Sequence, residues 1–222
     1  MKKIFLLFLI LSIITSSIFS QSKDEALKIM NSYKTILDTT TTYTCILHEY
    51  VKAKNKTTDN FWDYKFMKPK YIRMESIKGD RLGSKAFFDF KTQKVTGRQG
   101  GILSKIKLTL DLSNSLVKNI RGITIAQSDW LYVLNRTLDI LDDNDVEVST
   151  GEAKFKGEQS KFLHIKNIDL KKYGFDETKM FFDENNLLVG FYNFEMGDVV
   201  EDIHYQNIKI NPFLTIDSLY VK

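Results

Sequence analysis

The feature that most constrains the fold is an alternation of apolar and polar residues with a period of two. It first appears in four runs, Tyr43–Ala53, Phe61–Met67, Tyr71–Ile77 and Ala86–Phe90. Successive side chains of a strand point to opposite faces of its sheet, so this period predicts strands with one buried face. Because the polar turns between the runs are short, consecutive strands must run antiparallel. The chain is therefore predicted to form an antiparallel meander.

The alternation continues through the rest of the chain with one interruption. Further strands are predicted at Lys94–Arg98, Ile102–Leu112, Val146–Thr150, Phe162–Ile168, Lys179–Asp183, Leu187–Glu195, Val199–Ile210 and Leu214–Val221. The stretch Leu112–Ile120 fits either a short helix or a loop, and between residues 97 and 125 the pattern does not determine the structure.

In two segments the apolar residues recur every three or four positions, which is the spacing of a helix. Ser22 and Glu25 form the S-x-x-E pattern of a capping box, and an apolar stripe follows at Leu27, Met30, Tyr33 and Leu37. After Ser128 and Asp129, a second stripe is formed by Trp130, Leu134, Leu138 and Leu141. The predicted fold class is α+β and mostly β. It is a large curved antiparallel sheet, an incomplete barrel, covered by an N-terminal helix and a mid-chain helical segment.

The first twenty residues have the pattern of an export signal. Two lysines precede the uncharged apolar run Ile4–Ile14, and small residues follow up to Ser20. As a helix this run rises about 17 Å, which is short of the roughly 20 residues that a bilayer requires. The basic start and the Lys-, Asn- and Ile-rich body are typical of bacterial proteins. We predict a Sec signal peptide at residues 1–20 and, at 21–222, a single periplasmic domain that is soluble and monomeric.

Charge and composition argue against several classes of protein. The formal net charge of +4 falls to +2 without the two lysines of the signal, which gives no support to a nucleic-acid-binding role. The single cysteine, Cys45, cannot form an intrachain disulfide. It lies inside an alternating segment, and we expect a buried, unreactive thiol.

Motifs for catalysis or metal binding are not found. The chain has no G-x-S-x-G sequence, and the glycine-rich segment Gly97–Gly101 lacks the lysine and the helix of a P-loop. Asp143–Val148 begins like a calcium loop but has valine at the sixth position, where glycine is required. The histidines lie in separate predicted strands, at His48, His164 and His204. We therefore predict a protein that is not an enzyme, with no cofactor and no metal site.

Large apolar side chains gather on one face of three successive predicted strands. They are Trp62, Tyr64, Phe66, Ile72, Met74 and Phe88. Two interpretations fit this face: it is the core beneath the helices, or it lines an apolar cavity that binds a ligand.

The order of these elements resembles the LolA-like superfamily of bacterial envelope proteins, and most closely an uncharacterised exported LolA-like subfamily. The matching segments are Tyr43–Cys45, Phe66–Pro69, Gly101–Leu103, Leu110–Leu112 and Phe182–Leu187 through Tyr205–Asn211. The resemblance covers nearly all of the mature chain. The best-known member of the superfamily carries lipoproteins from the inner to the outer membrane.

The resemblance implies an incomplete barrel, closed by helices, that holds acyl chains in an apolar cavity lined by the six residues above. It places the lid contacts at Lys68, Trp130 and Leu134. The family's carrier has an arginine that fastens the lid just before the strand-turn proline, where this chain has Lys68. A lysine offers no planar bidentate fork, so the chain departs from the family pattern at this contact.

Two functions fit these expectations. The first is a periplasmic carrier whose partner is the acyl chain of a lipid or lipoprotein. The second is a sensory or regulatory module of the same fold that changes its affinity for an envelope protein partner when its ligand binds.

The export signal makes the first testable prediction. N-terminal sequencing of the protein recovered from its exported fraction should begin near Gln21, because the small residues before it suit a signal peptidase. A protein that still begins at Met1 in the membrane fraction would contradict this prediction.

Overall fold

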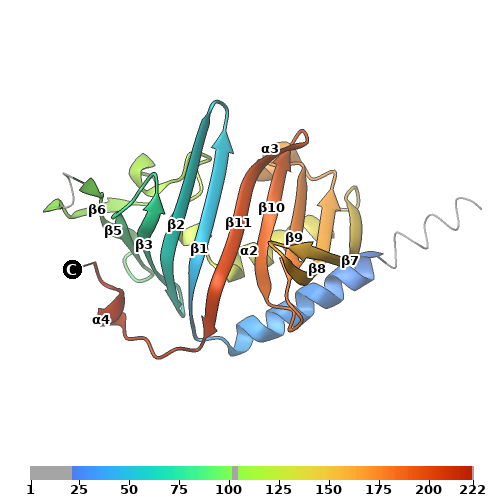
Figure 1. Cartoon of the computed structure of the whole chain (residues 1–222), viewed down its shortest axis with the longest axis horizontal. Helices are drawn as coiled ribbons and strands as arrows, with labels where there is room; N and C mark the ends of the chain where they lie inside the picture. The colour runs from blue at the N-terminus through green and yellow to red at the C-terminus, as the bar shows by residue number, and fades with distance from the viewer. Residues whose placement is uncertain (1–21, 102–104, 222) are drawn as a thin grey trace, which may run out of the picture.

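A single antiparallel sheet of eleven strands dominates the fold in the computed structural model (Figure 1). The structure describes residues 22–101 and 105–221, so the predicted signal at 1–20 and part of the predicted strand Ile102–Leu112 lie outside the described residues. The strand order is β6-β5-β4-β3-β2-β1-β11-β10-β9-β8-β7. Strands from the two ends of the chain therefore pair at the centre, and β6 and β7 form the open edges. The predicted incomplete barrel is this curved open sheet.

The strands fall into two groups on either side of the helix α2 in the sequence. Those before it are β1 Thr42–Ala53, β2 Lys56–Met67, β3 Tyr71–Gly79, β4 Lys85–Asp89, β5 Lys94–Arg98 and β6 Leu108–Asp111. Those after it are β7 Glu147–Phe155, β8 Glu158–Lys166, β9 Glu177–Phe182, β10 Leu188–Glu195 and β11 Asp198–Ile210. The helical elements are residues 22–39, the short 3-10 turns η2 Ser115–Val117 and η3 Ile125–Gln127, and the α-helices α2 Trp130–Asp142, α3 Leu170–Tyr173 and α4 Ile216–Leu219.

The alternation in the sequence predicts the buried face correctly. From Asn60 to Phe66 in β2, every second residue is buried and the residues between them are half-buried. The buried face is concave, and its apolar residues join the side chains of the helices in one large core. The face to which each strand turns could therefore be predicted from its period alone.

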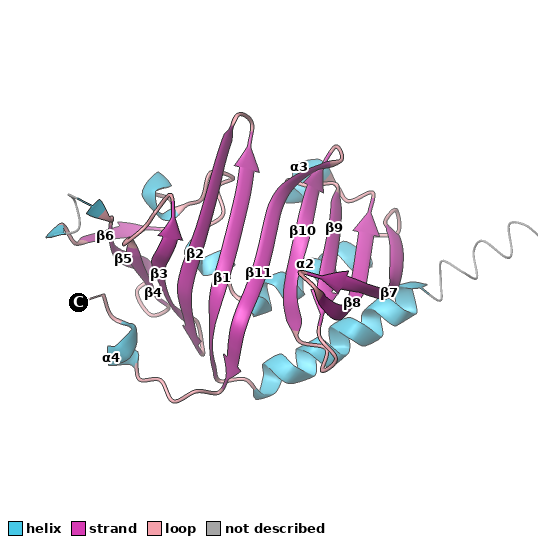
Figure 2. Cartoon of the chain, viewed as in Figure 1, coloured by secondary structure: helices cyan, strands magenta, loops and turns pink. Residues whose placement is uncertain are grey.

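The two long helices cover only part of the concave face. The N-terminal helix buries Ala26, Met30, Tyr33 and Leu37. From α2, the buried residues are Trp130, Val133, Leu134, Thr137, Ile140 and Leu141. Figure 2 shows α2 behind the sheet and the N-terminal helix along the half that contains β7–β11. None of the described helices is both long enough and apolar enough to cross a lipid bilayer.

The strand predicted at Leu214–Val221 is wrong. β11 already pairs with β1 on one side and with β10 on the other, so the chain that follows it cannot form a hairpin with β11. It instead crosses the convex face and forms α4, where Thr215 and Ser218 make a reciprocal capping box. Leu219 and Val221 then pack against Tyr71 and Phe87 in a second, smaller apolar cluster.

The stretch with no clear period is mostly irregular. In the segment Leu112–Ile120, which fitted a helix or a loop, the regular element is the 3-10 turn η2. The strand expected over Ile102–Leu112 is reduced to β6 in its described part. The short helix α3 was not predicted; it begins at the Asp169 cap and ends at Gly174, whose φ of 82° suits a glycine.

Two leucines of α2 allow a matched test of how the helix packs. Leu134 is 1% exposed, whereas Leu131 on the same helix is 43% exposed. Leu134→Ala should lower the free energy of unfolding by about 2–5 kcal/mol, because it leaves a cavity in the core. The matched change Leu131→Ala should alter it by less than about 0.5 kcal/mol. Urea unfolding curves would measure both, and equal losses would show that α2 does not pack as described.

Candidate functional site

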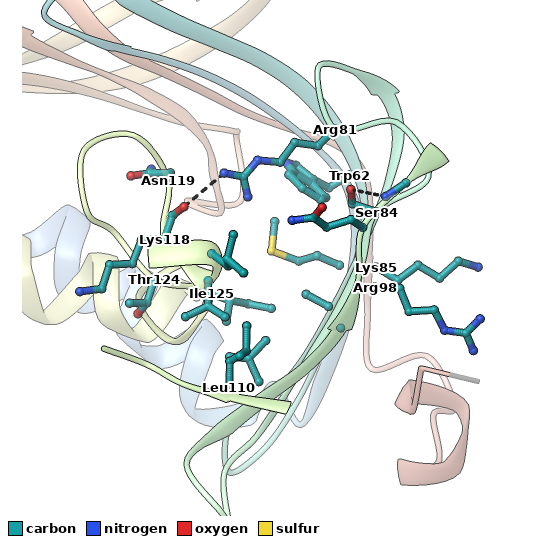
Figure 3. Close-up of a pocket in the computed structure, with 18 of the residues that line it drawn as sticks. Trp62, Arg81, Ser84, Lys85, Arg98, Leu110, Lys118, Asn119, Thr124 and Ile125 are labelled. Atoms are coloured by element: carbon teal, nitrogen blue, oxygen red, sulfur yellow. Dashed lines mark hydrogen bonds between the residues drawn. The ribbon is translucent and has the colours of Figure 1, made fainter. Parts of the chain in front are cut away.

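A cavity of about 610 Å³ lies between the concave face of β2–β6 and the segment 112–128 (Figure 3). It occupies the half of the sheet that the two long helices leave uncovered. Its volume falls within the roughly 300–1,000 Å³ that is typical of small-molecule sites.

The wall of this cavity on the sheet is apolar and comes from five neighbouring strands. Each strand contributes at least one residue, namely Trp62, Met74, Ala86, Val95 and Leu110. The segment on the opposite side adds Val117, Ile123 and Ile125. Strand pairing puts Met74 beside Ala86 and Val95 beside Leu110, so the wall is continuous.

One end of the cavity is polar. Glu49 of β1 accepts hydrogen bonds from Trp62 Nε1 at 3.0 Å and from Asn119 Nδ2 at 3.4 Å. Burial raises the pKa of Glu49, while these two hydrogen bonds and the charge of Arg81 oppose the shift. The cavity therefore has an apolar wall and a polar end, which Glu49, Asp80 and Arg81 border.

The segment 112–128 is anchored near the centre of the sheet. Lys70 Nζ lies 3.0 Å from Asp129 Oδ2 and donates to the carbonyl of Ala126 at 3.2 Å. Asp129 is fully buried and caps α2 by accepting a hydrogen bond from the amide of Tyr132 at 3.1 Å. The ion pair thus fixes both the end of the segment and the start of the helix.

Arg121 fastens the middle of the same segment. Its guanidinium donates to the carbonyl of Lys52 at 3.0 Å, to Glu195 Oε2 at 3.0 Å and to the carbonyl of Gly174. These partners come from β1, β10 and the end of α3. The segment that covers the cavity is therefore held at two separate places.

The structure distributes the six predicted lining residues between the cavity and the core. Trp62 and Met74 border the cavity. The other four are fully buried in the core that adjoins it, and they are Tyr64, Phe66, Ile72 and Phe88. Two of the six residues therefore border a cavity and four belong to the core, and ligand binding in the cavity stays a prediction.

The predicted lid contacts lie away from the cavity. Trp130 and Leu134 are each 1% exposed and pack in the core, so α2 covers the concave face without bordering the cavity. Lys68 Nζ donates to the carbonyls of Leu37 and Asp38, at the end of the N-terminal helix. The lysine that holds the start of α2 is Lys70, two residues further on.

Three residues that border the cavity were not predicted from the sequence. Glu49 occupies an apolar-face position of its strand, and an acid at such a position was a usable signal. Arg81 lies in a turn, and Ile125 lies in the stretch without a period, so no pattern in the sequence marked either of them.

The remaining candidate residues are the single cysteine and the histidines. Cys45 is 3% exposed and unpaired, as predicted, and burial raises its pKa well above the usual range. His48 lies directly opposite His204 in the pairing of β1 with β11, whereas His164 lies in β8. The described residues contain no group of three or more metal-ligating side chains.

Similarity to a solved structure identifies the fold of this chain. The Mycobacterium tuberculosis lipoprotein LppX is similar to this chain with a TM-score of 0.50 at 9% identity, over 86% of this chain and 97% of LppX. The chain has the LolA-like fold. MucB gives a TM-score of 0.48 at 9% identity, over 90% of this chain and 63% of MucB. A Vibrio parahaemolyticus domain described as an outer membrane lipoprotein-sorting protein gives 0.42 at 8% identity, over 89% of this chain and 97% of the domain. No protein-family model and no curated protein sequence matches the chain.

Two lysines of equal exposure allow a test of how much the ion pair at the start of α2 stabilises the fold. The side chains of Lys70 and Lys65 are both 26% exposed, but Asp129 is fully buried while Asp63, the partner of Lys65, is 35% exposed. Lys70→Ala should lower the free energy of unfolding by about 2–3 kcal/mol, because it leaves a buried carboxylate without its counterion.

The control Lys65→Ala should cost less than about 1 kcal/mol, as is usual for a surface ion pair. Chemical denaturation would measure both variants. A loss at Lys70 no larger than at Lys65 would show that this ion pair does not hold the helix.

Proposed function

We propose that the protein binds an acyl chain of a lipid or lipoprotein in the cavity and acts as a carrier in the cell envelope. The observation that carries this proposal is the continuous apolar wall formed by five strands of the sheet. A wall of this kind offers dispersion contacts along the length of a chain but few groups that would orient a small polar substrate.

The energetics favour a long apolar ligand. Each buried methylene group contributes roughly 0.8 kcal/mol, so a chain of several carbons can bind well without a polar contact. The cavity also opens onto exposed leucines. Leu82 is 61% exposed, Leu108 is 40% exposed and Leu116 is 51% exposed, and all three border the cavity. The apolar surface therefore continues from the interior to the mouth, which would let a chain enter.

The carrier role in the envelope rests on two further supports. One is the predicted export signal at residues 1–20, and the other is the resemblance of the sequence to the LolA-like superfamily. A carrier must release its ligand to an acceptor, and a binding site made mainly of apolar contacts suits such a transfer because no covalent bond has to break. We accordingly propose a binding protein rather than an enzyme.

A cavity-filling substitution tests the proposal. Ala86 borders the cavity from β4, so Ala86→Trp would place an indole where the ligand should lie. We expect this variant to lose binding of a fluorescent fatty acid by at least about tenfold, measured by titration of probe fluorescence.

The control is Ala153→Trp, because Ala153 is a half-buried strand alanine of β7 that does not border the cavity. This variant should bind the probe with unchanged affinity. Unaltered binding by the Ala86 variant, or no binding by the unsubstituted protein, would overturn the proposed function.

A further inference from the structure

Arg81 borders the cavity and forms no ion pair with the described part of the chain. Its guanidinium makes one hydrogen bond within the described residues, from Nη2 to the carbonyl of Lys118 at 3.2 Å. A guanidinium carries five N–H donors in a planar fork, and most of the donors of Arg81 have no acceptor among residues 22–101 and 105–221.

The turn that carries Arg81 is held rigidly in place. The amide of Arg81 donates to Oδ1 of Asn60 at 2.8 Å, and Asn60 is only 1% exposed. The amide of Asp59 donates to Oδ2 of Asp80 at 2.8 Å, which occupies the neighbouring carboxylate. Gly79 has a φ of 103°, and a Cβ there would lie 1.9 Å from the carbonyl oxygen of Asp59, so only glycine permits this close approach.

Other cations near the cavity are directed elsewhere. Figure 3 shows the side chains of Lys85 and Arg98 pointing away from the cavity, whereas Arg81 lies over it beside Trp62. Lys85 is paired with Glu75 at 2.7 Å. Arg81 is therefore the guanidinium that the fold presents to a bound molecule.

Two carboxyl groups border the cavity near Arg81, those of Glu49 and Asp80, and neither forms an ion pair with Arg81 among the described residues. Glu49 is engaged by Trp62 and Asn119 through one hydrogen bond to each of its oxygens. Burial raises the pKa of Glu49, while these two hydrogen bonds and the charge of Arg81 lower it.

We propose that the cavity selects an amphiphile with an anionic head group, a carboxylate or a phosphate, which Arg81 binds while the chain lies against the apolar wall. This inference rests on the proposed function and adds the class of head group. Charge-assisted hydrogen bonds from a guanidinium to these groups are short and frequently bidentate, and they are stronger than neutral ones.

Competition binding with three amphiphiles of equal chain length tests the inference. Dodecanoate, dodecyl phosphate and dodecanol would each displace a fluorescent fatty acid from the full mature protein. We expect at least one of the two anions to bind about tenfold more tightly than the alcohol. A preference for dodecanoate would assign the head group to a carboxylate, and a preference for dodecyl phosphate would assign it to a phosphate.

Matched variants decide whether Arg81 is responsible. Arg81→Gln should abolish the preference and leave the affinity for dodecanol unchanged, whereas Arg98→Gln should keep the preference. If Arg81→Gln does not fold, Arg81→Lys should give an intermediate preference, because a lysine keeps the charge but lacks the fork.

Two results would overturn the inference alone. One is equal binding of the alcohol and both anions by the unsubstituted protein. The other is a preference that survives undiminished in Arg81→Gln or, if that variant does not fold, in Arg81→Lys. Failure of all three amphiphiles to bind would overturn the proposed function together with it.

Discussion

The position at which α2 begins determines how the concave face is divided. Trp130, the first residue of α2, stacks on Tyr43 of β1 with ring centroids 3.9 Å apart, at the centre of the sheet. The preceding residue, Asp129, pairs with Lys70, the last residue of the turn before β3. Together the stack and the ion pair fix the helix over the half of the sheet that contains β7–β11. The other half, from β2 to β6, is left to be covered by the segment before the helix.

A cavity forms over that second half because an irregular segment, and not a helix, covers it. A helix presents a dense apolar stripe that can interdigitate with a sheet, whereas the segment 112–128 is irregular and contributes few large side chains. It is held instead by specific polar contacts, those of Lys70 near its end and of Arg121 in its middle. Packing is therefore dense beneath α2 and open beneath the segment, although both cover the same sheet. The apolar residues that face the open space are the physical basis for the proposed binding of an acyl chain.

The sequence was sufficient to predict the parts of the fold that depend on local periodicity. Alternation in β2 predicted its buried face, and the stripe that begins at Trp130 predicted α2. The last strand failed because pairing is a long-range property: nothing in Leu214–Val221 indicates that both neighbours of β11 are occupied.

The candidate site was predictable only in part, for the same reason. Trp62 and Met74 could be found because they lie on strands with a clear period. The segment 112–128 has no period, and its position follows from contacts with residues far away in the sequence, such as Glu195. Arg81 is an ordinary turn residue in the sequence. The role proposed for Arg81 follows only from the structure, where a hydrogen bond to Asn60 fixes the turn and the guanidinium lies over the cavity.

Photo-crosslinking with a diazirine-bearing fatty acid, followed by mass spectrometry of the peptides, tests the central claim most directly. The claim is that an acyl chain lies between β2–β6 and the segment 112–128. It predicts adducts on peptides that contain cavity residues such as Ala86, Val95 or Ile125. Adducts confined to the half of the sheet beneath α2, or to the convex face where Leu219 packs on Phe87, would contradict it.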